Sequence, residues 1–187
     1  MITNPKILIV PGLGGSGANH WQTYWSKKFK NSLKLSQDNW DEPTLSIWLK
    51  KLHNTITELN TPTIIVGHSL AVSLIMHWAK NYSNTNIKGA LLVAPADVDS
   101  PSHTPDVVRN FAPMPISKPP FPSIVIASEN DPYISIERAQ YFAKEWGSTF
   151  INIGEKGHIN SHSNLTYWEE GQAQLQQLIN DINLLSK

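Results

Sequence analysis

The chain has 187 residues, no cysteine, and equal numbers of basic and acidic side chains, 15 Lys plus Arg against 15 Asp plus Glu. Zero net charge argues against a protein that binds nucleic acid through its phosphates. The lack of cysteine excludes disulfides, thiolate nucleophiles and Cys-ligated zinc. No apolar run approaches the ~20 residues that cross a bilayer, and the first residues, MITNPKILIV, lack the apolar core and cleavage site of a signal peptide. We therefore expect one cytoplasmic domain over residues 1–187, without a membrane or nucleic-acid partner.

Short apolar runs alternate with helical patterns along the chain. Five runs are almost continuously apolar, as strands covered on both faces of a parallel sheet are, and a sixth at 33–36 is more polar and suits an edge strand. The five apolar runs are 6–10, 63–66, 89–93, 123–127 and 149–153. Apolar residues at helical spacing predict helices at 20–30, 45–59, 70–80, 136–146 and 175–185.

This alternation predicts a doubly wound α/β domain whose strands all end at one edge of the sheet, where ligands bind. One segment departs from the alternation, because residues 96–122 hold seven prolines and follow neither period. Loops of this length in a compact domain are usually functional. We therefore expect residues 96–122 to cover a site at that edge.

The junction between a strand and a helix carries the most specific chemical motif. The sequence TIIVGHSLA has the nucleophile-elbow pattern G-x-S-x-G, with alanine as its last small residue. In such an elbow a strained turn lifts the hydroxyl of Ser69 above the sheet, and the residues two before and two after it must be small. The N–H of Leu70 then lies at a helix N-terminus, where an oxyanion is stabilised. Ser69 is the predicted nucleophile, and Leu70 the first predicted oxyanion donor.

Two further strand ends supply an acid and a base. Asp131 follows the strand at 123–127 and His158 follows the last strand, so the chain order Ser, Asp, His is that of α/β-hydrolase triads. Glu129 and Asp97 are rival acids, and His162 is a rival base. Asp131 is favoured because the proline after it stiffens the turn that must aim the carboxylate. The two histidines are four residues apart in a loop without an HExxH pattern, so we expect no metal.

The glycine-rich loop PGLGGSGANHW permits two interpretations. In a hydrolase, its backbone supplies the second oxyanion donor, the N–H of Leu13. Gly12, Gly14 and Gly17 also spell G-x-G-x-x-G, and Asp38 follows where a ribose-binding acid would, as in dinucleotide-binding oxidoreductases. The proline before the glycines and the Ser, Asp and His set favour the hydrolase.

Four residues near these loops are candidates for contact with a substrate, namely Gly12, Gly14, Trp21 and His68. A nucleophile elbow turns the His68 side chain away from Ser69. His68 is therefore expected either to line the pocket or to have a structural role.

Taken together, the motifs resemble a known family. PGLGGSGANHWQ, GHSLA, the proline-rich FAPMPISKPPFPS leading into IVIASENDPY, and GHIN followed by WEEG are similar to the retinoblastoma-binding-protein-nine-like serine hydrolases of the α/β-hydrolase superfamily. The resemblance covers essentially the whole chain. It implies a three-layer α/β-hydrolase core of about six parallel strands with helices on both faces and no separate lid domain. Motif by motif, it implies that Ser69 is the nucleophile, Asp131 the acid and His158 the base.

The expected function is that of a serine hydrolase which cleaves small carboxylic esters, with amides as a second class, through an acyl-enzyme intermediate. Its partner would be a small-molecule acyl substrate, and no metal or organic cofactor is expected. The family's pocket-protein partner is bound through a motif that contains cysteine, so it is not transferred to this chain. A dinucleotide-binding oxidoreductase that uses the 12–17 loop and a non-catalytic binding protein with a hydrolase fold remain as alternatives.

Overall fold

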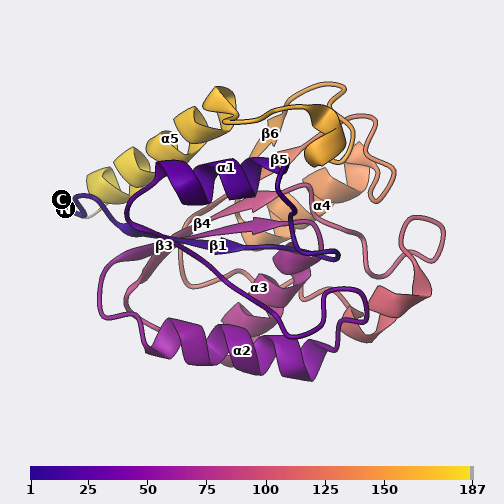
Figure 1. The fold of residues 1–187 in the computed structure, drawn as a ribbon, viewed down its shortest axis with the longest axis horizontal. Coiled ribbons are helices and arrows are strands. Elements are labelled where there is room, and N and C mark those ends of the chain that lie inside the picture. Colours follow the sequence, from indigo (N-terminus) through magenta and orange to yellow (C-terminus); the bar gives the residue numbers. More distant parts are fainter. Residues whose placement is uncertain (186–187) are drawn as a thin grey trace.

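The computed structural model of the protein describes residues 1–185 and contains one sheet of six parallel strands in the order β2-β1-β3-β4-β5-β6 (Figure 1). The strands are β1 Lys6–Val10, β2 Ser32–Lys34, β3 Thr63–His68, β4 Ile87–Val93, β5 Ser123–Ala127 and β6 Thr149–Asn152. This sheet confirms the predicted fold class. The expected single domain over residues 1–187 stays a prediction, and its last two residues lie outside the described part of the chain.

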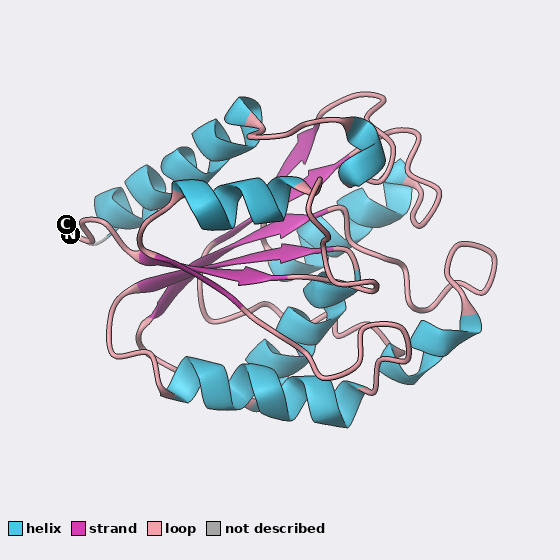
Figure 2. Ribbon diagram, in the orientation of Figure 1, coloured by secondary structure: helices cyan, strands magenta, loops and turns pink. Residues whose placement is uncertain are grey.

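Helices cover both faces of the sheet and complete a three-layer architecture (Figure 2). One face carries α1 Trp21–Lys28 and α5 Glu169–Leu185, and the other carries α2 Leu45–Thr57, α3 Leu70–Asn81 and α4 Ile136–Trp146. Each face has its own apolar core, because alternate residues of the strands point to opposite sides. In β3, Ile64 and Val66 pack with α1 and α5, whereas Ile65 packs with α2 and α3.

Some boundaries differ from those predicted, for local reasons. The edge strand β2 pairs with β1 only from Ser32 to Lys34, so it begins and ends earlier than the predicted 33–36. Leu35 still donates its N–H to the carbonyl of Ile9 over 2.8 Å, but the pairing ends there. Strand β6 is the other edge of the sheet and is partly exposed, so the prediction that it is covered on both faces is wrong. Helix α5 begins at Glu169, six residues before its apolar stripe, because acidic residues stabilise a first helical turn without needing burial.

The carboxyl ends of the strands meet at one edge, and the long loops gather there. The 96–122 segment lies at this edge and contains the short 3-10 helix η1 Asp106–Phe111. Val108 and Phe111 of this helix are buried. A second short 3-10 helix, η2 Ser161–Ser163, follows β6. Among residues 1–185, none of the helices has both the length and the apolar character that a membrane span requires.

Candidate active site

Ser69 lies in a strained turn between β3 and α3. Its φ and ψ angles are 60° and −124°, a conformation that residues other than glycine rarely adopt. The turn needs a residue without a side chain two positions before Ser69. That residue is Gly67, on which a Cβ atom would come within 2.3 Å of Ile75 Cδ1 in α3. Ala71, two residues after Ser69, is fully buried with only a methyl group. The elbow geometry expected from the sequence is present.

The imidazole of His158 joins Ser69 to Asp131. Its Nε2 lies 2.7 Å from Ser69 Oγ, and its Nδ1 lies 2.9 and 2.8 Å from the two carboxylate oxygens of Asp131. The carboxylate is an acceptor, so Nδ1 carries the proton and Nε2 is free to accept from the serine hydroxyl. The side chain of Asp131 is 0% exposed and that of His158 is 7% exposed. The three predicted residues therefore form one continuous hydrogen-bonded chain.

Hydrogen bonds between two loops bring the acid and the imidazole together. Asn130 Oδ1 accepts from the N–H of Gly157 over 2.6 Å, and Ser128 Oγ accepts from the N–H of Lys156 over 2.8 Å. One carboxylate oxygen of Asp131 also accepts from the N–H of Tyr133 over 2.9 Å. These hydrogen bonds thus join the loop after β5 to the loop after β6, close to the acid and the base.

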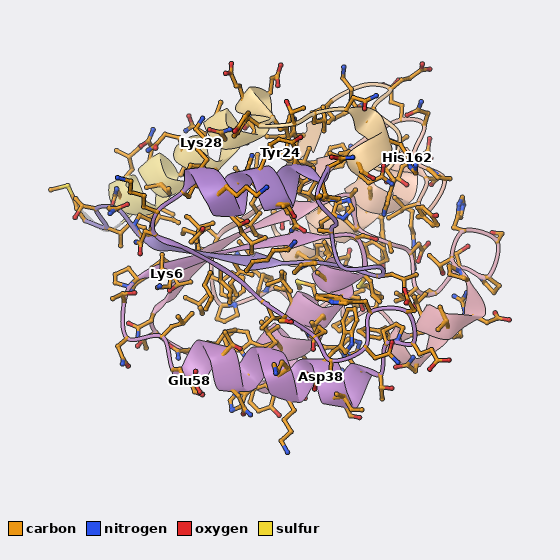
Figure 3. The ribbon with its side chains drawn as sticks, in the orientation of Figure 1. Lys6, Tyr24, Lys28, Asp38, Glu58 and His162 are labelled. Atoms are coloured by element: carbon orange, nitrogen blue, oxygen red, sulfur yellow. The ribbon has the colours of Figure 1, made fainter. Side chains whose placement is uncertain are left out.

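The rival acids and the rival base have other surroundings. Asp97 accepts from Arg138 Nε over 3.1 Å, and Glu129 accepts from Asn152 Nδ2 over 2.8 Å. His162 is exposed at the surface on η2 (Figure 3). None of the three joins the chain of hydrogen bonds at Ser69.

The glycine loop lies directly against the elbow. A Cβ atom on Gly12 would come within 2.7 Å of the carbonyl oxygen of His68 and 3.0 Å of the backbone nitrogen of Leu70. The next residue, Leu13, lines a cavity at Ser69 together with Leu70. The two predicted oxyanion donors therefore belong to backbone segments that touch each other beside the serine hydroxyl.

A cavity of about 140 Å³ opens on Ser69. Besides the elbow residues, His158 and Asn160, its wall is formed by loops that converge on the carboxyl edge: Leu13, Ala96, Thr104, Pro105, Val108 and Tyr133. The 96–122 segment supplies four of these six, so it does lie over the site as expected.

None of the four predicted substrate contacts lines this cavity. Trp21 is buried beneath it and donates its indole N–H to the carbonyl of Ile159 over 2.8 Å. His68 turns away from Ser69, as an elbow requires, and its Nε2–H donates to the carbonyl of His158 over 2.9 Å. Both side chains therefore contact the loop that carries His158. Gly12 and Gly14 are likewise not among the lining residues.

Burial keeps two neighbouring histidines neutral. Desolvation lowers the pKa of His20 to about 3, with smaller contributions from Lys34 and His158. Desolvation also lowers the pKa of His68 well below its ordinary value, assisted by His20 and His158. The rings of His20 and His68 are 4.7 Å apart, so two charged imidazoles would repel each other there. The imidazole of His158 therefore has uncharged aromatic neighbours on this side.

The dinucleotide interpretation does not fit the loop geometry. In that fingerprint the third glycine permits close packing of helix on strand, but a Cβ atom on Gly17 would meet nothing within 4 Å. Helix α1 begins only at Trp21, and Asp38 pairs with Lys51 over 3.5 Å beside α2 (Figure 3). Within residues 1–185, no three His, Asp or Glu side chains cluster closely enough to hold a metal ion.

Two lining residues were not foreseen from the sequence. The ring of Tyr133 lies 4.4 Å from the ring of His158, edge to face, and Asn160 lines the cavity at the start of η2. Tyr133 could have been suspected because it follows the candidate acid by two residues. Asn160 could have been suspected in the same way, because it ends the GHIN motif two residues after the candidate base.

Comparisons with known proteins are consistent with these observations. The family model described as serine hydrolase matches residues 7–177. A structure described as a YdeN-like hydrolase from Pectobacterium atrosepticum is similar at 30% identity and a TM-score of 0.83, covering 95% of this chain and 91% of its own. The ydeN gene product of B. subtilis is similar at 18% identity and a TM-score of 0.78, covering 94% and 99%. Est1E from Butyrivibrio proteoclasticus, with ferulic acid bound, is similar at 16% identity and a TM-score of 0.71, covering 94% and 90%. Because the last two structures are below 25% identity, their similarity shows a shared fold alone. A comparison with curated proteins finds no match.

Proposed function

Because this chain belongs to the serine hydrolase family, we propose that it cleaves small carboxylic esters through a covalent acyl-enzyme formed on Ser69. The observation that carries the proposal is the chain of contacts from Asp131 through His158 to Ser69, in which each hydrogen bond is shorter than 3 Å. Amides are a second substrate class for the same chemistry.

In the acylation step, Ser69 Oγ attacks the carbonyl carbon while His158 Nε2 takes its proton. Asp131 holds the imidazole with its proton on Nδ1 and stabilises the imidazolium that forms. When the tetrahedral intermediate collapses, the bond to the leaving oxygen breaks and that oxygen receives the proton from His158. The products of this step are the free alcohol and an acyl group esterified to Ser69.

The N–H groups of Leu13 and Leu70 are proposed to bind the oxyanion of the intermediate. Leu70 is the first residue of α3, so its N–H has no partner within the helix and lies at the positive end of the helix dipole. One such donor is typically worth ~3–4 kcal/mol in the transition state. Water then attacks the acyl-enzyme with His158 as the base, and the carboxylic acid leaves.

Hydrolysis of 4-nitrophenyl acetate tests this proposal. The wild-type protein is expected to release 4-nitrophenol, and Ser69→Ala is expected to lower kcat by about 1,000-fold or more. Ser161→Ala is the matched control, because Ser161 lies near the site on η2 but does not line the cavity. Equal activity in wild type and Ser69→Ala would reject Ser69 as nucleophile, and a wild type that turns over no ester would favour a binding role.

A further inference from the structure

Two hollows meet beside Ser69 and share Tyr133, His158 and Asn160. One is the cavity of about 140 Å³ between the elbow and the 96–122 segment. The other is a groove of about 530 Å³ along the loop that carries His158. An ester bound at Ser69 has two ends, and the two hollows offer each end a different space.

Proton transfer decides which end of an ester faces which hollow. The departing oxygen must lie within hydrogen-bond reach of His158 Nε2, because it receives its proton there. His158 lines both hollows, but Ser69 and the two proposed oxyanion donors line only the cavity, so the leaving group is assigned to the groove. The acyl group, whose carbonyl carbon is bonded to Ser69, is left with the smaller cavity.

The two hollows differ in size and in the side chains that belong to one of them alone. The cavity alone has the apolar side chains of Leu13, Pro105 and Val108, beside polar groups such as the Ser69 hydroxyl. A cavity of about this volume holds a molecule the size of benzene, or about six carbons. The groove is lined by hydrogen-bonding side chains, among them the exposed Lys156 and His162. A polar alcohol can replace its lost water contacts there, whereas an alkyl alcohol cannot.

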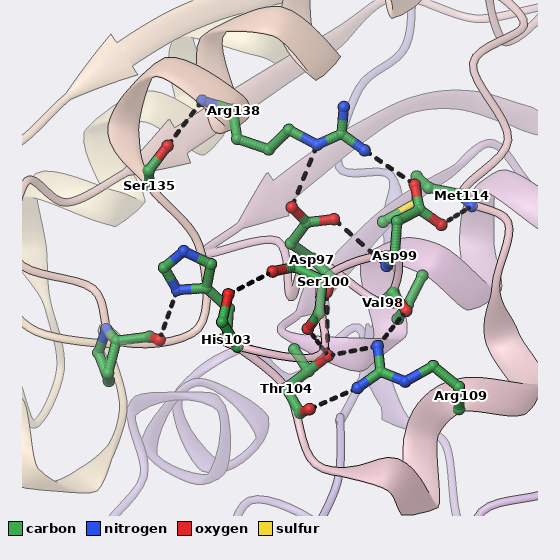
Figure 4. A network of polar contacts seen from close by, with 12 residues as sticks. Asp97, Val98, Asp99, Ser100, His103, Thr104, Arg109, Met114, Ser135 and Arg138 are labelled. Atoms are coloured by element: carbon green, nitrogen blue, oxygen red, sulfur yellow. Dashed lines mark hydrogen bonds and ion pairs between the residues drawn. The ribbon is translucent and has the colours of Figure 1, made fainter.

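Arg109 holds the segment that contributes Thr104 and Pro105 to the lining of the cavity (Figure 4). Its guanidinium donates to the carbonyl of Val98 over 2.6 Å and also to the carbonyl and the hydroxyl of Thr104. Thr104 is buried, and its hydroxyl donates in turn to the carbonyl of Asp97 over 3.0 Å. One arginine thus cross-links the stretch that lines the cavity at Thr104 and the adjacent Pro105.

The start of the same segment is tied to α4 and to the turn that holds the acid. Arg138 bridges the carboxylates of Asp97 and Asp99 at 3.1 and 2.9 Å (Figure 4). His103 Nδ1 lies 3.1 Å from the carbonyl of Pro132, which directly follows the acid. These contacts oppose an outward movement of this segment, so the cavity cannot widen easily for a long acyl chain.

We propose that the site selects esters that join a short acyl group, of up to about six carbons, to a larger alcohol rich in hydrogen-bonding groups. This rests on Ser69 and His158 acting as proposed above. Val108 is the specificity-determining residue, since it is 2% exposed and lines the cavity that the acyl group would occupy.

A series of 4-nitrophenyl esters tests the acyl end. For the wild type, kcat/KM is expected to fall about tenfold or more between butyrate and octanoate. Val108→Ala enlarges the cavity and is expected to narrow that ratio to about threefold. Val107→Ala is the matched control, because Val107 neighbours it in η1 but is 36% exposed and outside the cavity. Equal rates for butyrate and octanoate in the wild type would overturn the proposal, whatever the stability of the variants.

Two acetate esters of primary alcohols on six-membered rings test the leaving-group end. The sugar ester 6-O-acetylglucose is expected to have a kcat/KM about tenfold or more above that of cyclohexylmethyl acetate. An equal or higher value for cyclohexylmethyl acetate would overturn the assignment of the groove. A fluorophosphonate probe separates the two levels of failure: if Ser69 is labelled while the ester series fail, only the division of the site is wrong. If Ser69 is not labelled, the proposed function fails with it.

Discussion

The indole N–H of Trp21 donates to the carbonyl of Ile159 over 2.8 Å and so joins α1 to the residue that follows His158. Ile159 has φ of 49°, a left-handed conformation that a β-branched residue adopts only under constraint. The carbonyl one residue earlier, that of His158 itself, accepts from His68 Nε2 over 2.9 Å. Two buried aromatic donors therefore hold two successive carbonyls and keep the imidazole opposite Ser69.

Trp21→Phe removes the donor and keeps most of the packed ring. We expect kcat for 4-nitrophenyl acetate to fall about tenfold with little change in KM, because the imidazole is less well held. Tm should fall as well, since a buried carbonyl left without a partner costs about 1–3 kcal/mol.

Trp25→Phe is the matched control for that variant. Trp25 is equally buried and donates its indole N–H to the carbonyl of Tyr167 over 2.7 Å, away from His158. It should lose less Tm, because the carbonyl of Tyr167 still accepts from the side-chain amide of Gln172, and it should keep its kcat. Equal losses of kcat in the two variants would show that Trp21 acts through general stability alone.

The identity of the acid is tested by comparing two buried aspartates. Asp131→Asn is expected to lower kcat by about 10,000-fold, because an amide no longer favours the proton on Nδ1 of His158. Asp97→Asn is expected to keep kcat close to wild type while lowering Tm, since Arg138 then loses one of its two carboxylates. Steady-state kinetics and thermal melts check both. The opposite ranking of the two kcat values would assign the acid to Asp97.

Alanine substitutions at two glycines of one loop distinguish a change in the geometry of the site from backbone strain that leaves the site intact. Gly12→Ala forces a methyl group to within 2.7 Å of the backbone oxygen of His68, so the loop or the elbow must move. We expect at least about a 100-fold loss of kcat, as for a lost oxyanion donor. Gly14→Ala meets nothing within 4 Å but has φ of 74°, so it should cost about 1–2 kcal/mol of stability with kcat retained. A Gly12→Ala variant with normal kcat would contradict the proposed oxyanion site.

Stability should depend on pH through His20. Its folded pKa of about 3 lies below the unfolded value of 6.5, so between these values the unfolded state binds the additional proton. The stabilisation is complete above about pH 6.5 and is lost as pH falls, at up to about 1.4 kcal/mol per pH unit for this one group. His68 adds to the loss in the same direction, because its pKa is also lowered.

Urea unfolding of the wild type and His20→Asn between pH 4 and 7 measures this dependence. Asparagine can replace the histidine as the N-cap of α1, where His20 Nδ1 accepts from the N–H of Gln22 over 3.1 Å. The variant should lose less stability on acidification than the wild type. Identical pH dependence in the two proteins would show that His20 is not held neutral by the fold.

The sheet could be predicted because its inner strands are buried on both faces. A strand such as β3, buried from Thr63 to His68, is recognised as a short apolar run that is rich in β-branched residues and too short for a buried helix. The edge strand was misplaced by one or two residues because pairing on one side leaves little apolar pattern, as the exposed Leu33 shows. The expectation of a serine hydrolase in the α/β-hydrolase superfamily, which came from the resemblance, is confirmed by the family match.

At the site, chain order predicted which residues meet but not where neighbouring side chains point. Ser69, Asp131 and His158 each follow a strand of a parallel sheet, so their convergence follows from topology. Trp21 and His68 were candidates for contact with substrate, with a structural role as the alternative for His68. Their burial against the His158 loop depends on ring orientations that spacing does not encode. The network of Arg109 and Arg138 was also missed, because its partners are backbone carbonyls or distant carboxylates.

Labelling with a fluorophosphonate, followed by peptide mass spectrometry, tests the central claim most directly. The wild-type protein should gain one organophosphorus group, on the oxygen of Ser69, and Ser69→Ala should gain none. A label on another residue, or a wild-type protein that takes no label, would contradict the account.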